Sequence, residues 1–197
     1  MAKIEIINRA LLKLGEAPIS SLSDATFGRS YEIIYDDMKK LLLASYPWRF
    51  AVKKMHISRD AKKYDGYYVY RLPEDFLLLL KVTQEETCDS SALSHAVSSD
   101  YEIFGKSILC ASANGIVIEY VSSIDEKENF PSLFREALAA KIAAELAMRL
   151  KQSVNLKQVF DTEFYNFIRQ AELNNEIEKN AEILPDNSWV NVREMWS

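Results

Sequence analysis

The strongest helix signal in the chain is the stretch PSLFREALAAKIAAELAMRL, residues 131–150. Pro131 suits the first turn of a helix, because its missing N–H would have no intrahelical partner there. The residues that follow favour helix and include no glycine. A leucine or isoleucine recurs at every fourth position, at Leu138, Ile142, Leu146 and Leu150. These features predict one long and strongly apolar helix.

Small side chains should let this helix pack closely against others, because six of its residues are alanine. Its only continuous polar stripe is formed by Lys141, Glu145 and Arg149, which are spaced for i,i+4 pairing. A helix that is apolar around so much of its circumference has to be covered on more than one side. Two interpretations stay open at this point. The helix could be a scaffold element that packs in an oligomer, or the central helix of a monomeric bundle.

Three further segments have helical periodicity. Apolar residues recur at intervals of three and four over residues 3–14, 25–44 and 154–180. Residues 1–46 are therefore predicted to form an N-terminal helical pair, and residues 124–184 a C-terminal helical hairpin. Together the two pairs predict an antiparallel helical bundle.

Residues 47–123 are predicted to form a small antiparallel β subdomain inserted between the two helical pairs. Short apolar or alternating runs, separated by turn residues, indicate its strands. The predicted strands are residues 48–58, 67–72, 76–83, 101–104, 107–111 and 115–120. Residues 84–99 have little pattern and are predicted to be a loop or a small excursion. The predicted fold class is α+β, an antiparallel helical bundle with an inserted small antiparallel β subdomain and an extended C-terminal tail.

The predicted tail comprises residues 185–197. The helix before it turns polar beyond Ala171, as expected of a helix that leaves the body of the protein. Pro185 ends that helix. The tail is too short to have a core of its own, yet it contains Trp189, Val190, Val192, Met195 and Trp196. Apolar residues in such a segment usually dock on their own domain or on a partner.

Composition bears on the class of protein. A net charge of −5 argues against a dedicated nucleic-acid-binding protein. The two cysteines lack metal-type spacing, which favours a reduced intracellular protein without a disulfide framework. The N-terminal residues lack a signal-peptide pattern, and no segment is apolar for long enough to span a membrane.

No motif predicts a catalytic site, a metal site or a cofactor. The five glycines do not cluster in a phosphate-binding loop, and His56 and His95 have no ligands at metal spacing. Glu74 and Asp75 form a carboxylate pair, and paired carboxylates can carry out glycoside hydrolysis if tertiary structure provides the geometry. A turn with two acidic residues is the simpler interpretation of this pair.

Several motifs, taken in order, carry a resemblance to a known family. YPWRFA at Tyr46–Ala51 follows a long predicted helix, YRLPEDF at Tyr70–Phe76 follows two predicted strands, and FPSLFREALAAKIAAELA at Phe130–Ala147 opens the predicted hairpin. The flanking motifs are NRALLKLGEAPISSLSD at Asn8–Asp24 and DNSWVNVR at Asp186–Arg193. Together they span nearly the whole chain. In this order they resemble the head-to-tail adaptors of tailed phages, in particular the tail tubular protein A family of short-tailed phages.

The resemblance implies a virion structural protein rather than an enzyme. Members of this family form a ring, typically of twelve copies, beneath the portal of the filled capsid. The ring extends the DNA channel, through which packaged DNA passes without sequence-specific binding, and it offers a platform for a nozzle or tail-completion protein. Assembly would take place in the host cytoplasm. Related adaptors also serve long-tailed phages, so the type of tail stays open.

The resemblance also implies roles for individual residues. The C-terminal tail would dock on the portal protein through Trp189, Val190, Arg193 and Trp196. The packing face towards helices or neighbouring subunits would consist of Ala137, Ala140, Ala144 and Ala147. Trp48 and Phe50 would anchor the junction between the helices and the β subdomain.

Two other classes of function remain as alternatives. One is a virion-associated peptidoglycan hydrolase, with Glu74 or Asp75 as its acid. The other is a helical binding module of the host cell. Loss of peptidoglycan clearing in Glu74→Gln would favour the first, and a monomer without affinity for any portal ring would favour the second.

Overall fold

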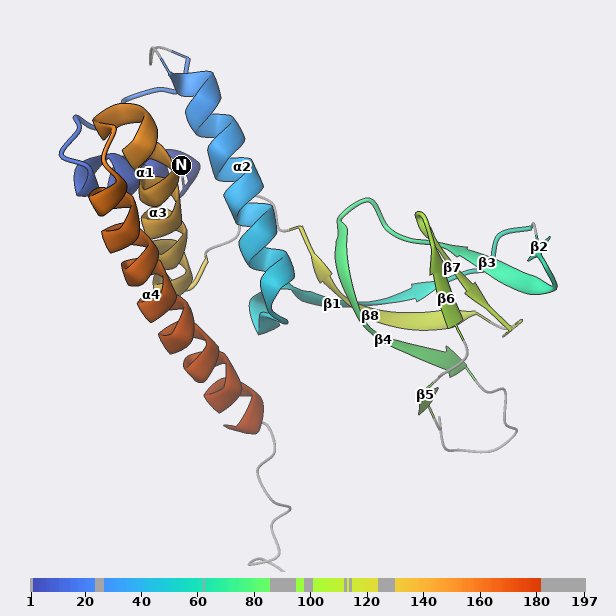
Figure 1. The fold of residues 1–197 in the computed structure, drawn as a ribbon. Coiled ribbons are helices and arrows are strands. Elements are labelled where there is room, and N and C mark those ends of the chain that lie inside the picture. Colours follow the sequence, from blue (N-terminus) through green and yellow to red (C-terminus); the bar gives the residue numbers. More distant parts are fainter. Residues whose placement is uncertain are drawn as a thin grey trace, which may run out of the picture.

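The computed structural model describes residues 2–23, 27–61, 63–85, 95–97, 101–111, 113, 115–123 and 130–181. These residues form a lobe of helices and a lobe of strands, which meet at the end of the second helix (Figure 1).

The helical lobe is built around the stretch with the strongest helix signal. Its helices are α1 (Ala2–Lys13), α2 (Gly28–Ser45), α3 (Ser132–Leu146), which continues through a π-helical turn (Ala147–Lys151), and α4 (Val154–Ala181). The helices α1, α2 and α4 all pack on α3. The packing face predicted for α3, which consists of Ala137, Ala140, Ala144 and Ala147, is fully buried within this lobe. The chain itself therefore covers the apolar circumference of α3.

The predicted antiparallel helical bundle is wrong. The helices α3 and α4 do form a hairpin, which turns at Gln152 in the left-handed conformation. The helix α1, however, lies across α3 rather than alongside it (Figure 1), and α1 and α2 pack mainly on α3 rather than on each other. Because α3 is apolar around most of its circumference, each partner helix can cover a different part of it. Periodicity indicates which face of a helix is buried and carries no information on its crossing direction.

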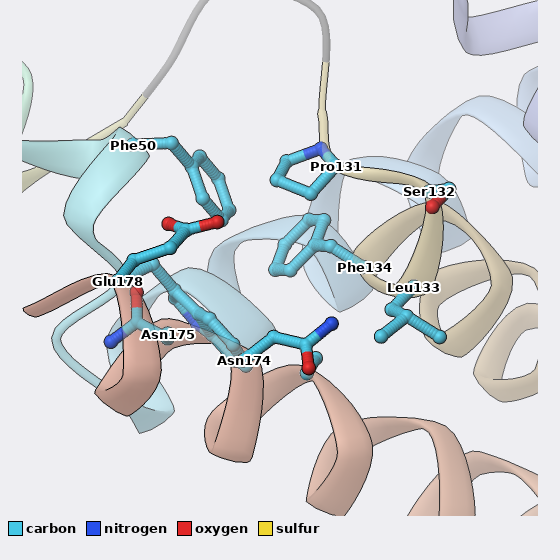
Figure 2. A pocket seen from close by; sticks show the side chains of 10 residues that line it. Phe50, Pro131, Ser132, Leu133, Phe134, Asn174, Asn175 and Glu178 are labelled. Atoms are coloured by element: carbon cyan, nitrogen blue, oxygen red, sulfur yellow. The ribbon is translucent and has the colours of Figure 1, made fainter. Parts of the chain in front are cut away.

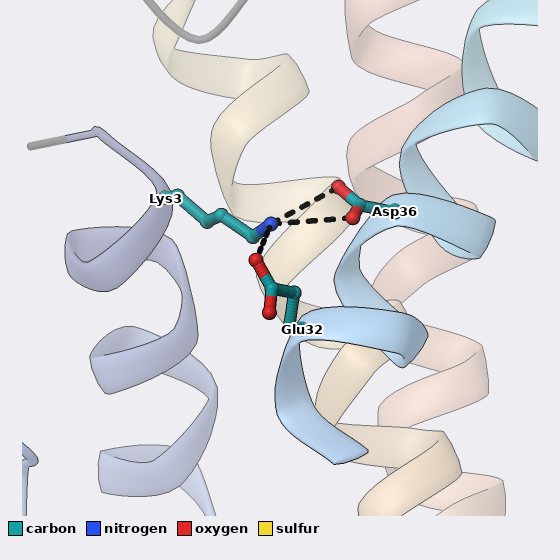
Figure 3. Close-up of polar contacts among 3 residues, drawn as sticks. All are labelled: Lys3, Glu32 and Asp36. Atoms are coloured by element: carbon teal, nitrogen blue, oxygen red, sulfur yellow. Dashed lines mark hydrogen bonds and ion pairs between the residues drawn. The ribbon is translucent and has the colours of Figure 1, made fainter. Parts of the chain in front are cut away.

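A polar cluster joins α1 to α2. The Nζ atom of Lys3 lies 3.0 Å from Glu32 Oε1 and 3.2 Å from Asp36 Oδ2 (Figure 3). The same ammonium group lies 5.2 Å from the centre of the Tyr35 ring, where a cation–π contact is favourable. Lys3 is only 7% exposed. Its charge is therefore balanced by the two carboxylates that flank it.

The β lobe contains two antiparallel sheets. Its strands are β1 (Val52–Ile57), β2 (Lys63–Tyr64), β3 (Tyr67–Arg71), β4 (Phe76–Glu85), β5 (His95–Val97), β6 (Tyr101–Phe104), β7 (Ser107–Cys110) and β8 (Ile116–Ser122). One sheet has the order β1-β8-β4-β5 and the other the order β2-β3-β7-β6. Residues 84–99 were predicted to be a loop or a small excursion without strands of its own, whereas in the structure β4 extends to Glu85 and β5 pairs with it. A three-residue strand is too short to produce a periodic signal.

Both sheets contribute side chains to a common core. Tyr70, Ile108 and Cys110 come from one sheet, and Ile57, Val82, Ile116, Ile118 and Tyr120 from the other. Strand β8 lies between β1 and β4, so that Ile118 is paired with both Met55 and Val82. At its far end Val121 belongs to the helical core instead. The central strand of the sheet therefore connects the two hydrophobic cores.

Candidate functional site at the junction of the two lobes

The segment between α2 and β1 turns its aromatic side chains towards the helical lobe. Trp48 is 1% exposed, and its indole Nε1 donates a hydrogen bond to the carbonyl oxygen of Leu42 at 2.8 Å. The Phe134 ring of α3 lies edge-on to Trp48, with ring centres 5.4 Å apart, and to Phe50, at 5.1 Å. Phe130 completes the cluster at 6.1 Å from Phe50. These edge-to-face contacts suit the charge distribution of aromatic rings. The structure therefore places both predicted junction residues, Trp48 and Phe50, where the lobes meet.

The last turns of α4 bind the same segment from the other side. The side-chain oxygen of Asn175 accepts a hydrogen bond from the Arg49 N–H at 2.9 Å. The Arg49 guanidinium donates to the carbonyl oxygen of Glu178 at 2.7 Å. The Tyr46 hydroxyl donates to Glu176 Oε1 at 2.5 Å, and burial together with this hydrogen bond raises the pKa of Tyr46. The prediction that α4 leaves the body of the protein beyond Ala171 is therefore wrong. The helix stays in contact with the rest of the protein up to Glu178.

A cavity of about 320 Å³ opens on one side of the junction. Figure 2 shows the rings of Phe50 and Phe134 on one side of it and polar side chains of α4 on the other. Its lining consists of Trp48, Phe50, Pro131, Ser132, Leu133, Phe134, Ala171, Asn174, Asn175 and Glu178. We call it the aromatic cavity. Small-molecule sites start at about 300 Å³, so it has room for one large side chain or a small ligand.

A second cavity, of about 480 Å³, has a different chemical character. Its lining consists of Pro47, Arg49, Val52, Leu80, Glu119, Asn175 and Glu176. None of the described residues that line it is aromatic, and three of them carry charge. Asn175 lines both cavities, so its side chain lies between them. Sequence reasoning missed Asn175, because an asparagine in a polar helical stretch has no periodic signal.

The helical lobe also exposes apolar side chains on its surface. We define the α2 face by Ile33 and Leu41, and the α4 face by Leu173 and Ile177. Leu41 is 51% exposed and Ile177 is 66% exposed. The helices that carry the two faces flank α3 (Figure 1). Both faces are therefore accessible to another molecule.

Asp75 contacts two side chains of the β lobe. Lys53 Nζ lies 2.8 Å from its Oδ2, and the Tyr120 hydroxyl lies 2.9 Å from its Oδ1. Burial opposes ionisation of Asp75, but hydrogen bonds from Lys53 and Tyr120 outweigh it and hold the pKa of the carboxyl below its ordinary value. A general acid in glycoside hydrolysis needs the opposite shift. Asp75, which directly precedes β4, thus links this strand to β1 through Lys53 and to β8 through Tyr120.

The other predicted site residues lie elsewhere. The alanine face of α3 is inside the helical core, with no accessible surface for a neighbouring subunit. The tail residues Trp189, Val190, Arg193 and Trp196 lie outside the described residues. Within the described part of the chain, no three His, Cys, Asp or Glu side chains are grouped so that they could hold a metal ion. None of the described helices combines the length and apolar character that crossing a bilayer requires.

No protein-family model matches the chain, and a search of curated proteins finds no match to it.

Proposed function

We propose that this protein is a head-to-tail adaptor of a tailed phage, which binds the portal vertex as a ring of about twelve copies. The ring would extend the DNA channel and carry the nozzle or tail-completion protein. The proposal originates in the ordered motifs of the sequence, which span nearly the whole chain.

The observation that carries the proposal is the pair of exposed apolar faces on two different helices, α2 and α4. Because the faces lie on different parts of the subunit, the α2 face of one copy can pack on the α4 face of the next, which is a head-to-tail contact. Such contacts generate closed rings when the rotation between copies closes. Burying exposed leucine and isoleucine side chains contributes about 1.5–3 kcal/mol for each fully buried side chain. Helices would then form the body of the ring, with the β lobe directed outward or towards the tail.

Contact with the portal is assigned to the C-terminal tail. Trp189, Val190, Arg193 and Trp196 supply two large aromatic groups and a cation, which are the residue types enriched at binding hot spots. Docking of this segment on the portal would act as an assembly switch. Free subunits would accordingly remain separate until they meet the portal of a filled head.

Electron microscopy tests the proposal directly. The purified protein is mixed with rings of the portal protein encoded near its own gene, and the complexes are imaged and averaged. We expect an additional collar on one end of the portal ring. We also expect this collar to be lost when residues 185–197 are deleted. Portal rings that stay bare with the full-length chain would contradict the adaptor function. A collar that forms equally well without residues 185–197 would contradict only the role of the tail.

A further inference from the structure

The aromatic cavity combines an apolar floor with a polar rim. Trp48, Phe50 and Phe134 provide three ring systems, whereas Asn174 and Glu178 provide oxygen atoms that accept hydrogen bonds. A group that satisfies both parts needs a large apolar body and one N–H or O–H donor. An indole has this composition, since its ring is apolar and its single N–H needs an acceptor when it is buried.

Two indoles, those of Trp189 and Trp196, follow α4 within a short stretch of sequence. The cavity is lined by Asn174 and Glu178, and α4 is described as far as Ala181. Residues 171–178 lie about 5–15 Å before the end of α4, at about 1.5 Å per residue. Trp189 follows Ala181 by eight residues, a span that can reach about 26 Å when extended. Pro185-Asp186-Asn187 has the composition of a turn, which would allow the chain to reverse.

We propose that the aromatic cavity binds the C-terminal segment of the same chain, with the indole of Trp189 as its occupant. Trp189 is preferred over Trp196 because it directly follows the turn-forming residues and needs the shorter connection. The indole packs against Phe50, Pro131 and Leu133, which keep accessible surface in the cavity, and its N–H donates to an oxygen atom on the rim.

This docking has a consequence that rests on the proposed adaptor function. While Trp189 occupies the cavity of its own subunit, it is withheld from the portal. Portal binding then competes with an intramolecular contact, which holds free subunits in an inactive state. The docking itself does not depend on the adaptor function and is tested without a portal.

Fluorine NMR on the full-length chain labelled with 5-fluorotryptophan tests the proposal. The chain has three tryptophans, so three resonances are expected, and Trp189→Phe and Trp196→Phe assign them. The shift difference between H2O and D2O reports contact of each ring with solvent. We expect the Trp189 resonance to lose most of this isotope shift, as the buried Trp48 does, and the Trp196 resonance to keep it.

A substitution at the mouth of the cavity provides the decisive comparison. Ser132 lines the cavity and is itself exposed, so Ser132→Arg obstructs the entrance without disturbing the core. We expect it to restore the full isotope shift at Trp189. The matched control is Ser58→Arg, at an exposed position in the β lobe, which should leave the resonance unchanged.

Each remaining outcome overturns the proposal. A Trp189 resonance with the same isotope shift as Trp196 means that the cavity does not hold it. Protection that disappears on dilution means that a second copy provides the indole. Protection that survives Ser132→Arg means that Trp189 docks elsewhere. None of these results bears on whether a collar forms on portal rings, so the two proposals fail separately.

Discussion

The side-chain oxygen of Asn175 on α4 lies 2.9 Å from the backbone nitrogen of Arg49, between the two lobes, and accepts its hydrogen bond. The Asn175 amide nitrogen lies 3.5 Å from the carbonyl oxygen of Pro47. Because Asn175 is only 6% exposed, water has little access to replace these contacts. Asn175 therefore satisfies two backbone groups, the Arg49 N–H and the Pro47 carbonyl, in the segment that connects α2 to the β lobe.

Replacing Asn175 should destabilise the protein. Asn175→Leu removes the acceptor for the Arg49 N–H, and leaving a buried donor unsatisfied costs about 1–3 kcal/mol. We expect a loss of this size in the free energy of unfolding, measured by urea denaturation. Asn174→Leu is the matched control, because Asn174 is the preceding residue on the same helix and is exposed. Equal losses in the two variants would show that the hydrogen bond to Arg49 contributes nothing.

The stability of the β lobe should depend on pH through Tyr120. Burial and the hydrogen bond to Asp75 raise the pKa of Tyr120 from 10.0 to about 12. A group whose pKa is raised in the folded state contributes stability that is fully present below pH 10 and is lost as the pH rises towards 12. The shift corresponds to about 3 kcal/mol. The pKa of Asp75 is lowered, so its contribution is present above its ordinary value of 3.8 and is lost as the pH falls below that value.

Comparison with Tyr120→Phe isolates this contribution, because the other titrating groups are common to both proteins. We expect the wild type to be the more stable protein near pH 7, by about 1.5–3 kcal/mol for a hydrogen bond to a charged group. The difference should shrink between pH 10 and 12, and again in acid below pH 3.8, where Asp75 becomes protonated. Thermal melts followed by circular dichroism measure this difference in stability between the wild type and Tyr120→Phe. A stability difference that does not change with pH would contradict the coupling of Tyr120 to Asp75.

The alanine face of α3 should not tolerate larger side chains. Ala144 has no exposed surface, and adding carbon atoms to a well-packed core costs about 1–3 kcal/mol. Ala144→Leu should therefore lower the midpoint of urea denaturation. Ala44→Leu makes the same change at an exposed site on α2 and should have little effect. If Ala144→Leu were as stable as the wild type, α3 would not be as closely covered by its own chain as the structure indicates.

Charged residues on the two apolar faces should block ring assembly without unfolding the subunit. Leu41→Glu on α2 and Ile177→Lys on α4 replace exposed side chains, so each variant should keep its thermal stability. Each should also abolish the collar on portal rings, because a charge buried without a partner is costly. Leu12→Lys on α1, which is 59% exposed and belongs to neither face, should leave the collar intact.

The double variant Leu41→Glu/Ile177→Lys tests whether the two faces meet. If the α2 face of one copy packs on the α4 face of the next, the new glutamate and the new lysine face each other at every interface and attract. Partial recovery of the collar is then expected. A double variant that assembles no better than either single one would show that the two faces do not contact each other.

The sequence by itself determined the type and place of the long elements. The stretch at 131–150 is helical and mostly buried because strong helix formers coincide there with apolar residues around most of the helix. The role of Trp48 and Phe50 at the junction came from the family resemblance of YPWRFA. Apolar or alternating runs located the longer strands, whereas β2 and β5 were missed because two or three residues cannot establish a period.

Only the tertiary structure decided how these elements are arranged. An apolar pattern fixes the buried face of a helix, but the crossing of α1 over α3 depends on which surfaces of α3 the other helices leave uncovered. The contact between Asn175 and Arg49 joins residues more than a hundred positions apart. This contact forms because α4 packs beside the segment between α2 and β1, and no local sequence pattern encodes the direction of α4. The aromatic cavity arises in the same way, because its walls come from three segments that meet only when the chain folds.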